Sequence, residues 1–100
     1  MRIIANRTIE GFKARHPAAR ASLDHWVQIT STASWATTAE VQASFSKAKV
    51  LDVERVRFEV AGGNFRLICA FEFPRGIAYV KFIGTHAEYD RIDALTVSRY

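Results

Sequence analysis

"RVRFEVAGGNFRLICAFEF", residues 55–73, is where the spacing of apolar residues changes from that of a helix to that of a strand. In "RVRFEV", apolar and charged side chains alternate, so one side faces a core and the other carries Arg57. "AGGN" (61–64) predicts a tight reversal, because glycine adopts positive φ without steric cost. The returning strand, 65–73, alternates again and carries Arg66 on the face away from its phenylalanines. The stretch therefore predicts an antiparallel hairpin with one apolar face.

A third strand follows the hairpin. "IAYVKFIG" (77–84) comes after a turn made by "PRG" and is again rich in β-branched and aromatic residues. We expect Val80 and Phe82 to point into the core, which leaves Tyr79 and Lys81 on the opposite face. The second half of the chain is therefore predicted to be an antiparallel meander.

The face of this meander away from the core carries the basic residues. A short reversal would place Glu59 beside Arg66 and Arg57 beside Ile68 on the neighbouring strand. Together with Lys81, the two arginines would form a cationic surface. The alternative is an ordinary solvated face with a Glu59–Arg66 cross-strand pair, which contributes roughly 0.2–1 kcal/mol.

The first half of the chain predicts helices. "RIIA" (2–5) is a short first strand, and Asn6 is placed to cap the helix that follows. Pro17 suits the first turn of a second helix, and "TTAE" (37–40) has the spacing of a capping box before a third. The stripes expected along these helices contain Ile9, Phe12, His16, Leu23, Trp26, Val27, Thr30, Val41 and Phe45. Helices that cover one face of an antiparallel meander make an α+β fold, in a single domain over residues 1–100.

Composition excludes several classes of protein. Hydrophobic residues are 49% of the chain and charged residues 24%, as in an ordinary globular protein. The single cysteine, Cys69, lies in the apolar strand pattern, where we expect an inert core residue and no disulfide. No apolar run is long enough for a membrane helix or a signal peptide, so we expect a cytoplasmic protein without a membrane partner.

The charge balance points to an acidic partner. The formal net charge is +4 and the isoelectric point is near 9.6. Most of the basic residues are arginines, which contact phosphate groups through two parallel hydrogen bonds. A small basic domain of this kind suggests a polyanion or an acidic protein as its partner.

Groups capable of proton transfer follow the third strand directly. In "THAEYD", Thr85 and Glu88 have the spacing of a capping box, which predicts a helix that starts at His86. His86, Tyr89 and Asp90 then lie on one side of the first turn. Cleavage of RNA through its 2′-hydroxyl needs one group to take that proton and another to protonate the leaving 5′-oxygen. Nearby cations would stabilise the charge that develops on phosphorus.

Each of these residues also has a purely structural interpretation. His86 could be a surface histidine at the start of a helix, and Glu88 could serve only as the capping partner. Tyr89 could bury its ring against the sheet, and Asp90 could pair with a neighbouring arginine. The other histidines lack the spacing of a ligand set, so we expect neither a metal site nor any other cofactor.

The sequence closely resembles the HigB toxins of bacterial type II toxin–antitoxin systems. The resemblance extends over nearly the whole chain and is carried by "GGNFRLICAF" (62–71) and "YVKFIGTHAEYDRID" (79–93). Its most specific parts are Gly63-Asn64-x-Arg66-Leu67 and Thr85-His86-x-Glu88-Tyr89-Asp90. Glu59 departs from the family pattern, in which asparagine often stands at this position.

The resemblance implies a RelE-like α+β fold with a short C-terminal helix. It also implies an mRNA interferase that acts mostly on the ribosome without a metal. Its partner would be an antitoxin with a helix-turn-helix domain, so that DNA is contacted only through the antitoxin. The residues expected to take part in catalysis are Arg66, His86, Glu88, Tyr89 and Asp90, and those expected to bind RNA are Arg57, Asn64 and Lys81.

Three functions remain compatible with the sequence. The first is an endoribonuclease toxin with mRNA on the ribosome as its substrate. The second is a basic RNA- or ribosome-binding module that blocks translation without cutting. The third is a protein-interaction domain in which "THAEYD" acts only as a helix cap. The sequence also leaves open whether residues 94–100 form a last strand, a helical continuation or a loose tail.

Overall fold

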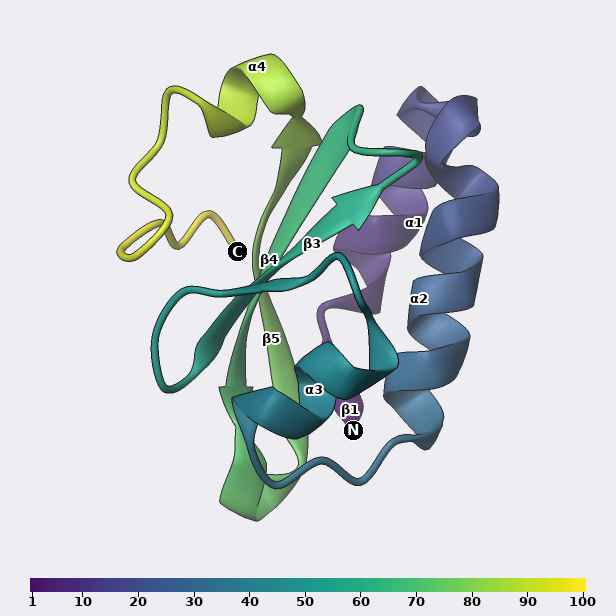
Figure 1. The fold of residues 1–100 in the computed structure, drawn as a ribbon. Helices are drawn as coiled ribbons and strands as arrows, with labels where there is room; N and C mark the ends of the chain where they lie inside the picture. The colour runs from purple at the N-terminus through teal and green to yellow at the C-terminus, as the bar shows by residue number, and fades with distance from the viewer.

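The sheet has five strands, and the computed structural model describes all residues from 1 to 100. Its spatial order is β1-β5-β4-β3-β2, with β1 parallel to β5 and every other neighbouring pair antiparallel (Figure 1). The first and last strands along the chain are therefore neighbours in the sheet. The bounds are β1 (Arg2–Ile4), β2 (Lys49–Val50), β3 (Arg55–Val60), β4 (Phe65–Glu72) and β5 (Ile77–Thr85).

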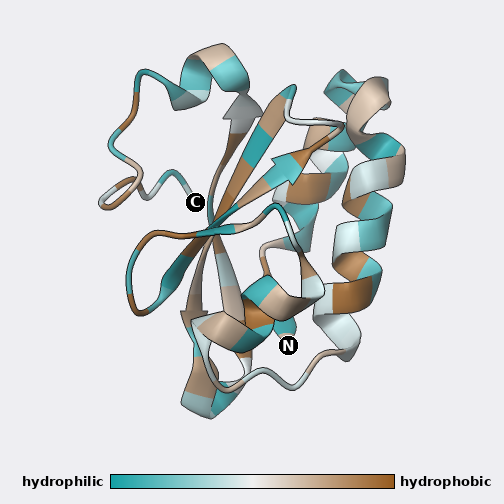
Figure 2. Ribbon diagram, in the orientation of Figure 1, coloured by the Kyte–Doolittle hydropathy of each residue, from teal (hydrophilic) through white to brown (hydrophobic).

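The helices lie mainly on one face of this sheet. Figure 1 shows α1 and α2 side by side on that face, with α3 crossing near its lower end. The helical segments are α1 (Asn6–Arg15), η1 (Pro17–Ala19), α2 (Arg20–Thr32), α3 (Thr38–Ser44), η2 (Phe73–Arg75) and α4 (His86–Tyr89). Hydrophobic and hydrophilic segments alternate along strands and helices (Figure 2), and the core lies between the two layers. The predicted α+β architecture is confirmed, and none of the helices is long and apolar enough to cross a membrane.

The central hairpin has the predicted register. Glu59 lies opposite Arg66, and Arg57 lies opposite Ile68. In the turn, Gly62 and Gly63 have φ values of +68° and +94°, a region that favours glycine. A side chain at Gly63 would also come within 2.9 Å of the Arg66 guanidinium, so this position needs glycine for two reasons.

The predicted caps of the first and third helices need correction. Asn6 is the first residue of α1, and Ala5 occupies the N-cap without a side-chain hydrogen bond. The Thr37 hydroxyl does accept a hydrogen bond from the backbone N–H of Glu40. The Glu40 carboxylate, however, accepts from the N–H of Ala36, one residue before the cap, so only half of the capping box forms.

The prediction that Phe82 faces the helices is wrong. Phe82 pairs with Ile68 and Val80 pairs with Cys69, so Lys81 is an extra residue that β4 does not match. Such a β-bulge reverses the alternation of side chains beyond it. Phe82 therefore lies fully buried on the face away from the helices, where the Arg99 guanidinium is 4.9 Å from its ring.

This second face is covered by the C-terminal strap, which we define as residues 94–99. The strap is neither strand nor helix, and Figure 1 shows it in yellow on the side of the sheet away from α1 and α2. The Arg55 Nη1 atom donates to the carbonyls of Ala94 and Val97 at 3.1 and 2.8 Å. The N–H of Arg99 donates to the Lys81 carbonyl at 3.0 Å. An open, solvated face was the wrong expectation here, because its apolar residues are buried: Ile68, Ala70 and Phe82.

Candidate functional site

Helix α4 is fixed to the end of the central hairpin. The N–H of His86 donates to the carbonyl of Asn64 at 3.0 Å, which ties the start of α4 to the β3–β4 turn. The predicted capping box is complete, because the Thr85 hydroxyl accepts from the N–H of Glu88 and the Glu88 carboxylate accepts from the N–H of Thr85. Gly84 allows this close approach, since a side chain there would lie 2.7 Å from the Phe82 ring. The start of α4 is therefore held by one backbone hydrogen bond to the turn and by the two hydrogen bonds of its capping box.

The Glu88 carboxylate is stabilised in its charged form. The backbone N–H of Thr85 donates to it and lowers its pKa, against the opposing effect of partial burial. The hydrogen bond with the Thr85 side chain lowers the pKa further, as do the nearby charges of Arg99 and His16. Glu88 is therefore ionised at neutral pH, where it cannot supply a proton.

The capping role of Glu88 makes a prediction about acid stability. When folding lowers the pKa of a carboxyl, the group stabilises the folded protein at every pH above its ordinary pKa of 4.5. This stabilisation is lost as the pH falls through the lower pKa of the folded state. In Glu88→Gln, the amide oxygen can still accept from Thr85 but does not titrate. We expect the variant to be nearly as stable as the parent at pH 7 and to lose less stability on acidification, as measured by urea unfolding. An identical pH dependence in the two proteins would contradict this role.

His86 is paired with a carboxylate one turn later. Its Nδ1 atom lies 3.1 Å from Oδ2 of Asp90, and both side chains are more than half exposed. A carboxylate in this position holds the proton of a neutral imidazole on Nδ1 and leaves the lone pair on Nε2. The predicted spacing of these two residues thus produces an oriented histidine with a free nitrogen near solvent.

Arg66 is the most buried charged group near α4. Its side chain is 10% exposed, and its Nη1 atom donates to the Gly63 carbonyl at 2.7 Å and to Glu59 Oε1 at 3.3 Å. Its Nε atom is buried without a hydrogen-bond partner, although buried polar atoms are usually paired. Both protein contacts use Nη1, so Nη2 is left for a ligand.

Tyr89 joins this arginine to the helix. The guanidinium of Arg66 lies 5.9 Å from the centre of the Tyr89 ring, which is also 6.3 Å from the ring of Phe82. Both contacts involve the half-buried ring and leave the hydroxyl available. The structure thus places Arg66 against Tyr89 of α4, the same short helix that carries His86, with Asp90 directly after it.

Residues 19–92 match the family model of the HigB toxins, described as the RelE-like toxic component of a toxin–antitoxin system. The chain belongs to this family. The matched region runs from the end of η1 through α4 and contains every residue for which a site role was predicted. A search of curated proteins gave no match. As the toxic component of such a system, the protein has a cognate antitoxin as its partner.

The residues predicted to bind RNA in this HigB-family toxin are not equally close to α4. Asn64 is exposed in the turn and anchors His86 through its carbonyl. Arg57 is half-buried, and its Nη2 atom donates to the Lys47 carbonyl at 3.5 Å. Lys81 lies in the middle of β5, away from α4, and its ammonium group is 5.4 Å from the Tyr79 ring. The structure therefore separates Lys81 from the group around Arg66.

Two residues near the site were missed by the sequence analysis. His16 packs 5.2 Å from the ring of Phe65, and it lowers the pKa of Glu88 together with Arg99 of the strap. Both lie outside the residues that match the HigB toxin family. Their positions depend on how α1 and the strap pack, so no local motif could have indicated them. No group of three or more histidine, cysteine, aspartate or glutamate side chains is placed to hold a metal ion.

Proposed function

We propose that this toxin is an endoribonuclease that cleaves mRNA on the ribosome and thereby inhibits translation. The observation that carries the proposal is the His86–Asp90 pair at the start of α4, the short helix whose Tyr89 ring lies 5.9 Å from the Arg66 guanidinium. An oriented imidazole and a nearby cation are two of the elements that cleavage through the 2′-hydroxyl requires, and the Tyr89 hydroxyl can supply the third, a proton donor. Membership of the RelE-like toxin family supports the same activity.

The proposed reaction uses side chains of this chain alone. His86 Nε2 removes the proton from the 2′-hydroxyl, while Asp90 holds the imidazole in the required tautomer. The 2′-oxygen attacks phosphorus, and Arg66 Nη2 stabilises the additional negative charge. The Tyr89 hydroxyl donates a proton to the leaving 5′-oxygen. Glu88, which the family resemblance placed among the catalytic residues, serves here as the cap that positions His86.

New 5′ ends in cellular mRNA would test the activity directly. We expect induction of the toxin to produce such ends within coding regions, and the His86→Ala variant to lose them. A module that binds the ribosome without cutting would arrest translation and leave the pattern of ends unchanged. Arrest without new ends would therefore overturn the nuclease proposal and favour the binding module.

We propose that Arg57 and Lys81 contribute to RNA affinity and take no part in the chemical step. Replacing either with alanine should weaken binding to ribosomes or RNA and reduce the slope of log K against log salt by roughly 0.7 for each single-strand phosphate that the side chain neutralises. Arg75→Ala is a matched control, because its side chain is 72% exposed in η2, away from α4. Titrations at several salt concentrations would measure the slopes. Unchanged affinity at every salt concentration would remove that residue from the RNA surface.

The cognate antitoxin is proposed to be an acidic or helix-rich protein with a helix-turn-helix domain. It would block access to the cationic surface formed by Arg57 and Arg66, because an unrestrained ribonuclease arrests the growth of its host. Co-expression with the product of the neighbouring gene should restore growth. Persistent toxicity, despite a complex verified by co-purification, would exclude that product as the antitoxin.

A further inference from the structure

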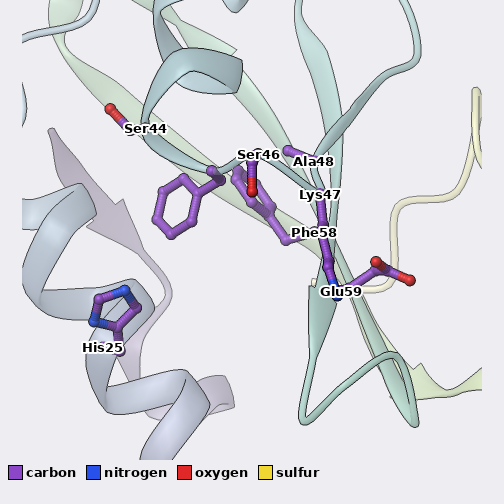
Figure 3. Close-up of a pocket in the computed structure, with 8 residues that line it drawn as sticks. His25, Ser44, Ser46, Lys47, Ala48, Phe58 and Glu59 are labelled. Carbon is purple, nitrogen blue, oxygen red and sulfur yellow. The ribbon is translucent and has the colours of Figure 1, made fainter.

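A pocket of about 220 Å³ lies apart from α4, between α2, the segment that joins α3 to β2, and β3. Figure 3 shows the residues that line it, with His25 on one side and Lys47 and Glu59 on the other. Pockets for whole small-molecule ligands usually measure roughly 300–1,000 Å³. This one is therefore sized for a part of a larger ligand.

Aromatic rings form the inner walls of the pocket. The Phe45 ring lies edge-on to the His25 imidazole at 6.5 Å and edge-on to the Phe58 ring at 5.1 Å. His25 is exposed and Phe45 half-buried, so flat faces are accessible beside a buried floor. Flat aromatic and imidazole surfaces of this kind stack on the bases of single-stranded nucleic acids.

Polar groups surround these rings. The hydroxyl of Ser46 and the ammonium group of Lys47 are on exposed residues at the rim. Glu59 adds carboxylate oxygens, of which Oε1 is paired with Arg66. The rim therefore offers both donors and acceptors to the edge of a heterocyclic base, with a positive charge for the adjoining phosphate.

The pocket is connected to the candidate active site. Glu59 lines the pocket and also pairs with the Arg66 guanidinium at 3.3 Å. The Lys47 carbonyl accepts from Arg57, which fixes the rim of the pocket to the same strand. For a ligand whose phosphate lies at Arg66, only the Glu59 side chain therefore separates that phosphate from the pocket.

We propose that this pocket binds a single base of the RNA substrate, next to the phosphodiester that is cleaved. The inference rests on the proposed ribonuclease function and adds a determinant of sequence preference to it. Stacking on the exposed His25 imidazole, with the base edge against the Phe45 ring, provides the affinity, and the hydroxyl, ammonium and carboxylate groups at the rim distinguish one base from another.

Binding can be tested without cleavage. The four nucleoside 5′-monophosphates, titrated into the full chain, should shift the imidazole resonances of His25, with one base giving the strongest response. The His25→Ala variant should bind that nucleotide roughly 5- to 150-fold more weakly, the range for loss of one stacked base. Gln28→Ala is the matched control, because Gln28 is exposed on α2 one turn beyond His25 and does not line the pocket.

Cleavage maps provide the second measurement. In His25→Ala, we expect cuts to continue but the base preference at one position beside the cut to weaken by a similar factor, with the Gln28→Ala map unchanged. If no nucleotide shifts the His25 resonances and the cleavage map of His25→Ala is unchanged, the base-binding pocket is refuted while the nuclease proposal is unaffected. A His25 response in a wild-type protein that cuts no RNA would refute the nuclease and support the pocket. A response to the antitoxin alone would assign the pocket to that protein and overturn the proposal.

Discussion

Replacing His86 with alanine should slow the cleavage step by roughly 10²–10⁴-fold, the usual contribution of a positioned acid or base. The Nε2 atom is the proton acceptor in the proposed reaction, and the Nδ1 contact with Asp90 keeps it in the required tautomer. His86 is exposed and carries little packing, so binding and folding should change little. Single-turnover cleavage of ribosome-bound mRNA would measure the step, with thermal melts as the check on folding.

Glu88→Gln is the control for this experiment. Glutamine can complete the capping box with Thr85, so α4 should keep its position and the variant nearly full activity. Full activity in His86→Ala would remove the proposed mechanism while the fold assignment stays intact. A well-folded but inactive Glu88→Gln would move the proton-transfer role from the imidazole to the carboxylate.

Arg66→Ala should reduce the rate of cleavage by roughly 10²–10³-fold, because the charge that develops on the phosphate is no longer stabilised by the guanidinium. Arg66→Lys should recover only part of the rate, because lysine offers a point charge without the planar fork of the guanidinium. The ion pair with Glu59 should keep the folded state largely intact in Arg66→Lys, since the ammonium group can replace the guanidinium there.

The kinetic constants separate this role from a simple binding role. Weaker transition-state stabilisation lowers kcat together with kcat/KM, whereas removal of a phosphate interaction made equally in the ground state raises KM with kcat unchanged. We expect Arg66→Ala to lower kcat and kcat/KM together. An unchanged kcat in a folded Arg66→Ala protein would place Arg66 with Arg57, as a residue that only positions RNA.

Local rules predicted much of the candidate site. The Glu59–Arg66 register follows from a short glycine turn, and the start of α4 follows from the spacing of Thr85 and Glu88. The contact between His86 and Asp90 likewise follows from their separation by one helical turn. Each of these features depends on residues that are neighbours in sequence or joined by a tight turn.

The features that sequence analysis missed depend on the whole structure. The bulge at Lys81 adds one residue to β5, and nothing in the alternating pattern marks it, so Phe82 was assigned to the wrong face. Ile68 is buried on a face that periodicity presents as open, because the strap and the neighbouring strands cover part of that face. The 10% exposure of the Arg66 side chain arises from contacts with Gly63, Glu59 and Tyr89, three residues from different elements. Tertiary contacts of this kind leave no periodic pattern in the sequence.

The pairing of β1 with β5 has a consequence for how the toxin is made. Arg2 lies opposite Ile77 and Ile4 opposite Tyr79, so the sheet joins residues 75 positions apart in the sequence (77 − 2 = 75). During synthesis, β1 leaves the ribosome long before its partner strand exists, and contacts so distant in sequence form late in folding. A transcript severed upstream of the codon for Ile77 would yield a fragment without β5 and α4, and so without His86 and Tyr89. If the proposed cleavage included the toxin's own message, every cut upstream of that codon would yield an inert fragment, and synthesis of the toxin would be self-limiting.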